Sequence, residues 1–306
     1  MSGCYVVFHK QLGDLLLLEP TLAKLHAHHG APVAVITRSG HEPLLELMAS
    51  AQYQPGYPLA WRSHLYAFDP KSKSAWRSLL APASRKVAVL PSRDEACWYH
   101  PLIFGRPIIP GLGSAYIAEY FWQHVPVPEG EPFRLPRLAR PPEAWRPAGF
   151  SDEPFVLLNP TSGWKQKMWR ADRWIEVLPA VRERLGARLL MTSTSIDWQL
   201  AHCREIAEGS GALVESLPGS TSLREFLWLC SRARAILTVD GAASHLAQAF
   251  GVPSLALFGP TSVENWHRDT ARNFAIQAPA KDGKRSMKHL SAEAVLAAVE
   301  RLSASE

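Results

Sequence analysis

The sequence predicts an α/β protein made of two Rossmann-like, doubly wound domains, and three observations lead to this class. Its 306 residues suit two domains at the usual ~150 residues each. In both halves, short apolar runs typical of buried strands alternate with stretches of helical periodicity. A proline-rich segment, residues 126–154, separates the halves and is typical of a linker. We therefore predict a first domain over residues 1–145 and a second over 146–306.

The first half opens on a strand, a helix and a second strand. Residues 4–8 form an apolar run like a buried parallel strand, and a polar loop follows over residues 9–14. Leucines at three- and four-residue steps from Leu15 to Leu25 predict a helix, which Gly30 ends. The alternation continues with a strand at 33–37, helices near 43–49 and 72–80, a strand at 86–90 and a helix near 115–123.

The second half repeats the alternation more regularly. We expect strands at residues 155–158, 188–192, 212–215, 235–239 and 254–258. We expect helices at residues 171–185, 196–208, 223–230, 243–250 and 292–302. Because ligands bind at the carboxyl ends of parallel strands, a central cleft between the two sheets is the expected place of function.

Composition excludes several classes of protein. The 33 basic and 28 acidic residues give a net charge of +5, which favours anionic ligands but is too small to indicate nucleic acid. No two of the four cysteines form a Cys-x-x-Cys pair, and His26, His28 and His29 lack the spacing of a metal motif, so no metal site is predicted. The chain shows neither a membrane-length apolar segment nor a signal peptide, which predicts a cytoplasmic protein.

In each half, the loop that follows the first strand carries candidate residues. In residues 9–14, Asp14 either caps the next helix or presents its carboxylate for chemistry. In residues 159–169, the hydroxyls of Thr161 and Ser162 and the charge of Lys167 suit a diphosphate, although such a lysine is equally often a solvated surface charge. The spacing is not that of a P-loop.

Two later loops also follow predicted strands. In residues 238–245, the small Gly241, Ala242 and Ser244 open a helix whose backbone N–H groups suit a phosphate. Asp240 ends the preceding strand, and His245 contacts a ligand or serves as a hydrogen-bonded structural histidine. The loop over residues 258–262 adds a glycine and a hydroxyl, Gly259 and Thr261.

These loops, in this order, resemble the family 9 glycosyltransferases, the ADP-heptose:lipopolysaccharide heptosyltransferases with the GT-B architecture. The resemblance spans most of the chain and rests on four motifs, which are Gly13-Asp14 with Pro20, Lys167-Met168-Trp169, Asp240 to His245 with Gly251-x-Pro253, and Phe258-Gly259-Pro260-Thr261. Two departures lie in donor-side loops, Gly241-Ala242 in place of Thr-Gly and Arg170 in place of a proline.

The resemblance implies inverting, metal-independent transfer of heptose from ADP-L-glycero-β-D-manno-heptose to the lipopolysaccharide inner core, with no cofactor. It implies Asp14 as the base and Lys167 as the stabiliser of the diphosphate, which agrees with their residue types. The same resemblance places the other donor contacts at Thr161, Ser162, Asp240, Gly241, Ala242, Ser244, His245, Gly259 and Thr261.

The expected partners are a nucleotide sugar and an anionic lipopolysaccharide core acceptor, with peripheral contact to the inner membrane surface and no nucleic acid. From their charge and position, Lys10, Arg38, Arg62 and Arg93 are the expected acceptor-binding residues of the first domain. From position alone, Asp197 or Gln199 is expected at the ribose. We expect the terminal helix to pack back on the first domain.

Three other functions remain open from the sequence. A family relative could use another acceptor, a different core position or a protein, or another nucleotide sugar. A nucleotide-sugar epimerase or a dinucleotide-dependent enzyme is disfavoured because the first strand–helix turn lacks the glycine fingerprint. A binding protein that has lost catalysis is disfavoured because Asp14 and Lys167 are both present.

Overall fold

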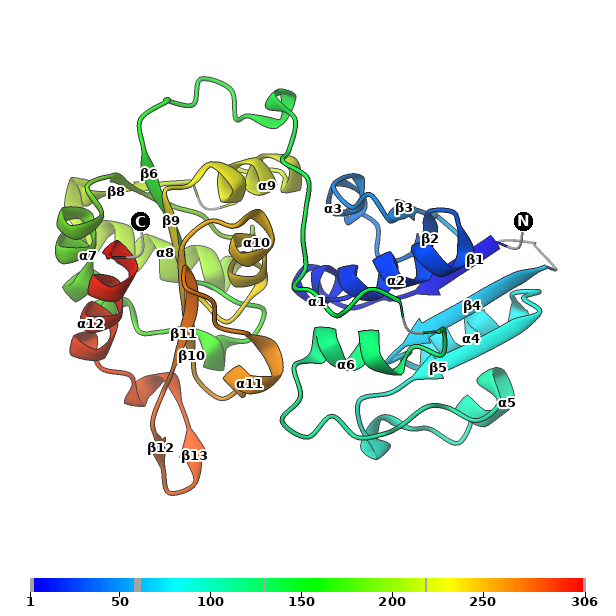
Figure 1. Ribbon diagram of the computed structural model, residues 1–306. Helices are drawn as coiled ribbons and strands as arrows, with labels where there is room; N and C mark the ends of the chain where they lie inside the picture. Colours follow the sequence, from blue (N-terminus) through cyan, green and yellow to red (C-terminus); the bar gives the residue numbers. More distant parts are fainter. Residues whose placement is uncertain (1–2, 58–61, 129, 218, 305–306) are drawn as a thin grey trace. The chain divides into compact units, whose positions relative to one another are not determined.

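The chain forms two α/β units, each of which is described by itself. The computed structural model describes residues 3–57, 62–128, 130–217 and 219–304 (Figure 1). Contacts between Cα atoms divide the chain into Met1–Ala139 and Arg140–Glu306. The predicted class, with one doubly wound sheet in each unit, is confirmed.

The first unit has a five-stranded parallel sheet in the order β3-β2-β1-β4-β5. Its strands are β1 (Gly3–Val7), β2 (Val33–Ile36), β3 (Ala51–Tyr53), β4 (Ser63–Phe68) and β5 (Arg85–Val89). Its helices are α1 (Leu12–Leu17), α2 (Glu19–His29), α3 (Glu42–Glu46), α4 (Ser72–Leu80), α5 (His100–Phe104) and α6 (Ile117–His124), with a 3-10 turn η1 (Arg93–Glu95).

The second unit has a six-stranded parallel sheet in the order β11-β10-β9-β6-β7-β8. Its strands are β6 (Phe155–Asn159), β7 (Arg188–Met191), β8 (Val214–Ser216), β9 (Ala235–Val239), β10 (Ser254–Phe258) and β11 (Asn273–Gln277), with a hairpin of β12 (Ala280–Lys281) and β13 (Lys284–Arg285). Its helices are α7 (Ala171–Leu185), α8 (Asp197–Gly209), α9 (Leu223–Arg232), α10 (Ala242–Phe250), α11 (Val263–Trp266) and α12 (Ala292–Ser303).

Most predicted elements lie where the periodicity puts them, and the differences have local causes. The helix expected from Leu15 to Leu25 is two helices, α1 and α2, and Pro20 lies in the first turn of α2, where its missing N–H costs little. Gly30 ends α2 with a φ of 70°, the left-handed conformation that favours glycine. Strands β3, β4 and β11 are absent from the sequence prediction.

The boundary between the units lies earlier than the predicted one. Glu143 and Trp145 belong to a 3-10 turn that packs on α9 of the second unit. The Glu143 carboxylate accepts hydrogen bonds from Trp228 Nε1 at 3.3 Å and from Arg232 at 3.1 Å. These contacts attach the end of the proline-rich segment to the second unit.

The terminal helix α12 packs on the core of the second unit. Its Val295, Val299 and Leu302 are fully buried in the core that α7 and the sheet also line. Figure 1 shows α12 in red beside α7, and the two helices are in extensive contact. The indole Nε1 of Trp169, at the start of α7, also donates to the carbonyl of Leu290 at 3.0 Å.

Candidate functional site

Each sheet has one switch point, where the connections leave in opposite directions and where ligands bind in such folds. In the second unit it lies between β6 and β9, which pair in parallel with Leu158 opposite Leu237. In the first unit it lies between β1 and β4, where Val7 pairs with Ala67. The loops that follow these four strands therefore hold the candidate site residues.

An ion pair joins the two loops at the switch point of the second unit. Lys167 Nζ lies 2.7 Å from Oδ2 of Asp240, and the two side chains are 15% and 4% exposed. The Thr261 hydroxyl donates to the same carboxylate oxygen, and the Ser162 hydroxyl donates to the Asp240 carbonyl at 2.9 Å. Four residues predicted from three separate loops, Ser162, Lys167, Asp240 and Thr261, are thus in direct contact.

The lysine has an aromatic neighbour on its own loop. Lys167 Nζ lies 4.8 Å from the centre of the Trp164 ring, and Trp164 is 60% exposed. Trp169 and Trp174 are buried and pack against each other with ring centres 5.3 Å apart. Trp169 and Trp174 therefore belong to the hydrophobic core, and Trp164 borders the site.

Helix α10 begins directly after Asp240. Gly241 is its N-cap, and the first N–H groups of an α-helix have no partner inside it and favour an anion. Ser244 is fully buried and its hydroxyl donates to the Gly241 carbonyl at 2.8 Å, so it serves the helix and not a ligand. Gly241 and Ala242 are partly exposed at the start of the helix.

His245 is buried behind the ion pair. Burial lowers the pKa of its imidazole to about 4, and the positive charges of His267 and Lys167 act in the same direction while the Asp240 carboxylate opposes them. The imidazole is therefore neutral at physiological pH and does not supply charge to a phosphate. Among the described residues, its Nδ1 has no hydrogen-bond partner.

Packing limits three further residues that were predicted to contact the donor. A Cβ at Gly259 would lie 2.6 Å from Cγ of Met287 and 3.1 Å from its backbone nitrogen, so this glycine is required for close packing. Gln199 is 2% exposed, and its side-chain amide donates to the Ser162 carbonyl and accepts from the Thr194 hydroxyl, at 2.9 Å each. Because both ends of the amide have internal partners, the structure does not support the predicted ribose contact for this residue. Thr161 is 5% exposed.

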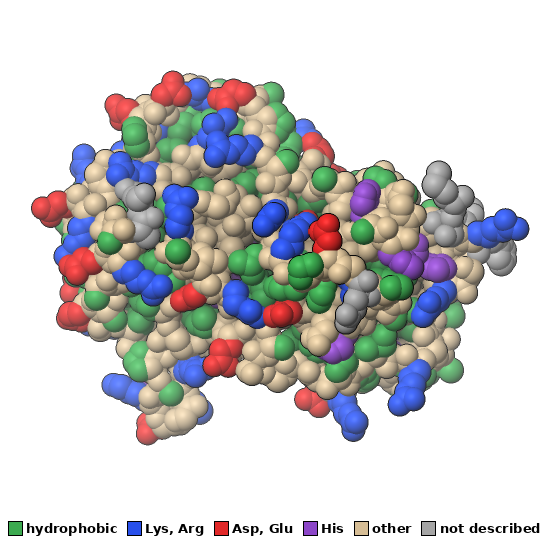
Figure 2. Space-filling view, viewed as in Figure 1, with side chains coloured by type: hydrophobic (Ala, Val, Ile, Leu, Met, Phe, Trp, Pro, Cys, Tyr) green, Lys and Arg blue, Asp and Glu red, His purple; other side chains and the backbone are tan. Residues whose placement is uncertain are grey.

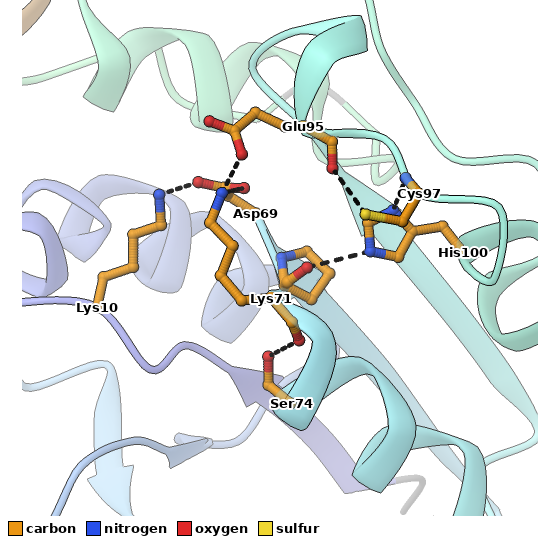
Figure 3. A network of polar contacts seen from close by, with 8 residues as sticks. Lys10, Asp69, Lys71, Ser74, Glu95, Cys97 and His100 are labelled. Carbon is orange, nitrogen blue, oxygen red and sulfur yellow. Dashed lines mark hydrogen bonds and ion pairs between the residues drawn. The ribbon is translucent and has the colours of Figure 1, made fainter.

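The switch point of the first unit carries a corresponding pair, Lys10 and Asp69 (Figure 3). Lys10 follows β1 and forms an ion pair with Oδ2 of Asp69, which follows β4 and has a side chain that is 1% exposed. Lys71 lies 3.2 Å from the other carboxylate oxygen and also pairs with Glu95. Asp69 adopts a φ of 46°, a conformation unusual for a residue other than glycine.

Asp14 lies in the first turn of α1, on the same loop as Lys10. Its Oδ2 accepts a hydrogen bond from the backbone N–H of Gln11 at 3.2 Å, so the capping role is observed. Burial lowers the pKa of the Lys10 ammonium, and the negative charge of Asp14 acts in the opposite direction. The two groups therefore lie within electrostatic range of each other.

A pocket of about 540 Å³ opens beside this loop, within the first unit. His9, Thr37, Tyr53, Tyr57, Arg77 and Leu80 are among its lining residues. Burial lowers the pKa of His9, and the positive charges of Arg77, Arg38 and Lys73 lower it further. Tyr53, one of the lining residues, donates a hydrogen bond to the carboxylate of Glu42. The lining of this pocket thus combines one guanidinium, that of Arg77, with the rings of Tyr53 and Tyr57.

The structure separates the four predicted acceptor residues. Lys10, Arg38 and Arg93 follow the carboxyl ends of β1, β2 and β5, and Arg38 donates to the His9 carbonyl at 3.0 Å. Arg62 directly precedes β4, whose first residue pairs with Gly3 at the start of β1. Arg62 therefore lies at the amino edge of the sheet, opposite the carboxyl ends that the other three follow, which sets it apart from the acceptor site predicted for all four.

Sequence reasoning missed the buried Asp69 and the pocket residues Tyr53, Tyr57 and Arg77. The apolar run before Asp69-Pro70 was the available signal for the first, since a carboxylate that ends such a run lies at the carboxyl edge of a parallel sheet. In the described residues, no group of three or more His, Cys, Asp or Glu side chains has the geometry to hold a metal ion.

The chain matches known proteins over both its sequence and its fold. The family model "Glycosyltransferase family 9 (heptosyltransferase)" matches residues 124–294. Lipopolysaccharide heptosyltransferase 3 of Escherichia coli strain K12 is 31% identical over 159 residues, which is 48% of this chain and 46% of that relative. The match thus spans less than half of the length of this curated relative.

Two solved structures share the fold over nearly the full length. E. coli ADP-heptose lps heptosyltransferase II superposes with a TM-score of 0.81 at 18% identity, over 99% of this chain and 98% of that chain. E. coli heptosyltransferase WaaC with ADP superposes with a TM-score of 0.75 at 18% identity, over 98% and 99% of the two chains.

Proposed function

This chain belongs to glycosyltransferase family 9, the heptosyltransferases, and from that membership we propose that it transfers heptose from ADP-L-glycero-β-D-manno-heptose to a hydroxyl of the lipopolysaccharide inner core. The observation that carries the proposal is the contact of Lys167 and Thr261 with the buried Asp240 at the switch point of the second unit. These three residues belong to three of the four motifs that resemble the family. The proposal for the sugar and the nucleotide is supported by the similar proteins, which are lipopolysaccharide heptosyltransferases described with ADP-heptose or ADP.

The second unit is proposed to bind the donor. An ammonium has three N–H donors, so Lys167 can hold Asp240 with one and a phosphate oxygen with another. The first N–H groups of α10, at Gly241 and Ala242, would share the charge of the departing diphosphate. Because Asp240 fixes the lysine in place, its positive charge is positioned before the substrate arrives.

The first unit is proposed to bind the acceptor and to supply the base. The acceptor oxygen attacks the anomeric carbon, its proton passes to the Asp14 carboxylate, and the bond to ADP breaks with its electron pair on the leaving phosphate. Direct displacement of this kind inverts the anomeric configuration. The pocket that His9 of the same loop lines suits a saccharide, because it combines tyrosine rings, hydroxyls and the charge of Arg77.

We further propose that the leaving group is stabilised by Lys167 and backbone donors without a cation. Calorimetric titration of the purified protein with ADP, GDP, UDP and NAD, in the presence of a chelator, tests this directly. Selective binding of ADP is the expected outcome. Preference for UDP or GDP would contradict the proposed ADP-heptose donor but keep a glycosyltransferase. Binding of NAD alone would contradict the transferase proposal itself.

A transfer assay identifies the acceptor. Core saccharides truncated at successive positions are incubated with ADP-heptose, and the product is analysed by mass spectrometry and NMR for the new linkage and its anomeric configuration. Transfer to an inner-core saccharide with inversion is expected. Transfer only to an outer-core position or to a protein would keep the chemistry and change the substrate.

A further inference from the structure

One surface of the first unit exposes large apolar side chains, and we name it the α4–α5 surface. Its members are Trp76, Leu79, Leu80, Trp98 and Leu102, which are 41%, 43%, 82%, 75% and 68% exposed. Among the described residues only two other large apolar side chains are comparably exposed, Trp164 and Ile196. The exposed apolar area of the chain is thus concentrated on one short segment, which is typical of an interaction site.

Helix α4 has its amphipathic pattern reversed. Its inner face buries the small Ser74, Ala75 and Ser78, while Trp76, Leu79 and Leu80 point outward. The buried hydroxyls are satisfied within the helix, since Ser78 donates to the Ser74 carbonyl and Ser74 to that of Lys71, each at 2.8 Å. The inner face of α4 is thus small and satisfied in its hydrogen bonds, while its large apolar residues are exposed.

Ring contacts join the two tryptophans of the α4–α5 surface to each other and to Tyr99. Ring centres of Trp76 and Trp98 lie 6.0 Å apart, and Tyr99 lies 5.4 Å from Trp76 and 5.7 Å from Trp98. Helices α4 and α5 are in contact with each other. Figure 1 shows α4 behind β4 and β5 and α5 at the lower right, and Figure 2 shows hydrophobic side chains in green next to Lys and Arg side chains in blue over the lower right of the same view.

The segment that carries this surface has an excess of basic residues. Residues 71–106 contain seven Lys or Arg and two acidic residues, so this segment carries as much net charge as the whole chain. Lys73 precedes Trp76 by one helical turn, and Arg106 follows Leu102. Of the two acidic residues, Asp94 and Glu95, the second forms an ion pair with Lys71.

We propose that the α4–α5 surface docks on an anionic lipid bilayer, with the tryptophans at the level of the head groups, the leucines below them and the basic residues on the lipid phosphates. Tryptophan suits this interface because its ring is apolar and its N–H is polar. Lys and Arg are drawn to anionic lipid, whereas a second copy of the chain would oppose one positive surface to another. None of the helices in the described part of the chain is long and apolar enough to cross the membrane.

Docking at the α4–α5 surface would serve the proposed transfer reaction, and in this respect the inference rests on the proposed function. Arg77 and Leu80 of α4 line the pocket beside the Asp14 loop, so the pocket and the docking surface share one helix. An acceptor saccharide attached to a membrane lipid would then enter from the bilayer side. The helix that contacts the lipid would also contact the sugar.

Sedimentation with vesicles tests the proposal. The full chain should bind vesicles of equal parts phosphatidylcholine and phosphatidylglycerol and bind phosphatidylcholine vesicles at least tenfold more weakly. Trp98→Ser with Leu102→Ser should lower the partition coefficient on the anionic vesicles by about tenfold or more, since each side chain loses its apolar burial. Ile196→Ser, an exposed apolar residue of the second unit, is the matched control and should bind as the wild type does.

A charge-reversed pair provides the second arm. Lys73→Glu with Arg106→Glu should abolish the preference for anionic vesicles, whereas Lys281→Glu with Lys284→Glu on the β12–β13 hairpin should preserve it. The proposal is overturned if the two charge-reversed pairs bind the anionic vesicles equally, or if the apolar double variant binds them as the wild type does. A concentration-dependent dimer that Trp98→Ser dissociates also overturns it. ADP affinity, measured without vesicles, reports separately on the proposed donor site and should be unchanged in every variant.

Discussion

The ammonium of Lys167 lies 2.7 Å from the buried carboxylate of Asp240, and the pair joins loops that follow the two central strands of the second sheet. The first sheet has the same arrangement, with Lys10 on Asp69. In each unit a lysine and a buried aspartate thus meet at the switch point. Removing one partner of such a pair leaves an uncompensated buried charge, which costs about 3–5 kcal/mol.

Lys167→Met is expected to weaken ADP binding by about 10- to 100-fold, because a charge-assisted hydrogen bond to phosphate contributes roughly 1.5–3 kcal/mol. Isothermal titration measures the change. Lys165→Met is the matched control, since Lys165 lies in the same turn and stacks over Trp198 at 5.5 Å. Equal losses in both variants would show that the loop, and not the ammonium of Lys167, is responsible.

Asp14→Asn is expected to lower kcat by about 100-fold or more, the scale for loss of a general base, while ADP affinity stays within about twofold. Asparagine retains a side-chain oxygen for the Gln11 N–H, so the capping contact survives. Single-turnover transfer and thermal unfolding are measured together. A normal rate in a folded variant would remove Asp14 from the role of base.

His245 should make the stability of the second unit depend on pH. The folded pKa of about 4 lies below the unfolded value near 6.5, so the unfolded chain binds more protons between these values. Stability is therefore complete above about pH 6.5 and falls as the pH drops toward 4, by up to about 3 kcal/mol from this group. His245→Gln should lose less stability than the wild type between pH 7 and pH 5 in denaturant titrations. Parallel curves for the two proteins would exclude this residue as the source.

Arg77→Ala is expected to remove binding of an anionic sugar to the pocket of the first unit. Glucuronate should show saturation-transfer NMR signals with the wild type, and methyl glucoside should show much weaker ones, because only the former has a carboxylate for the guanidinium. Arg77→Lys should restore part of the signal, and Arg85→Ala, at the start of β5, should keep all of it. Equal signals from both sugars would mean that charge does not select the ligand.

Much of the fold could be predicted because helical periodicity and buried apolar runs are local features of the sequence. Helices α4 and α7 and strands β9 and β10 occupy the predicted residues. Strand β4 was missed because it begins with the polar Ser63 and His64, so that its apolar run is short, and β3 because it has only three residues. Short or mixed strands acquire their identity from the neighbours with which they pair.

The sequence by itself determined the two α/β halves, the family and the identity of Lys167, Asp240 and Thr261, because order and spacing along the chain are enough for motifs that begin at strand ends. Only the tertiary structure decided which side chains touch: it brought Thr261 onto Asp240, committed Gln199 and Ser244 to internal hydrogen bonds, and moved Arg62 to the opposite edge of its sheet. It also placed Trp98 beside Trp76 on a charged apolar surface that no motif marks. Hydrogen bonds and burial depend on distances across the fold, and those distances follow from strand order and helix packing, which the local pattern of residues does not contain.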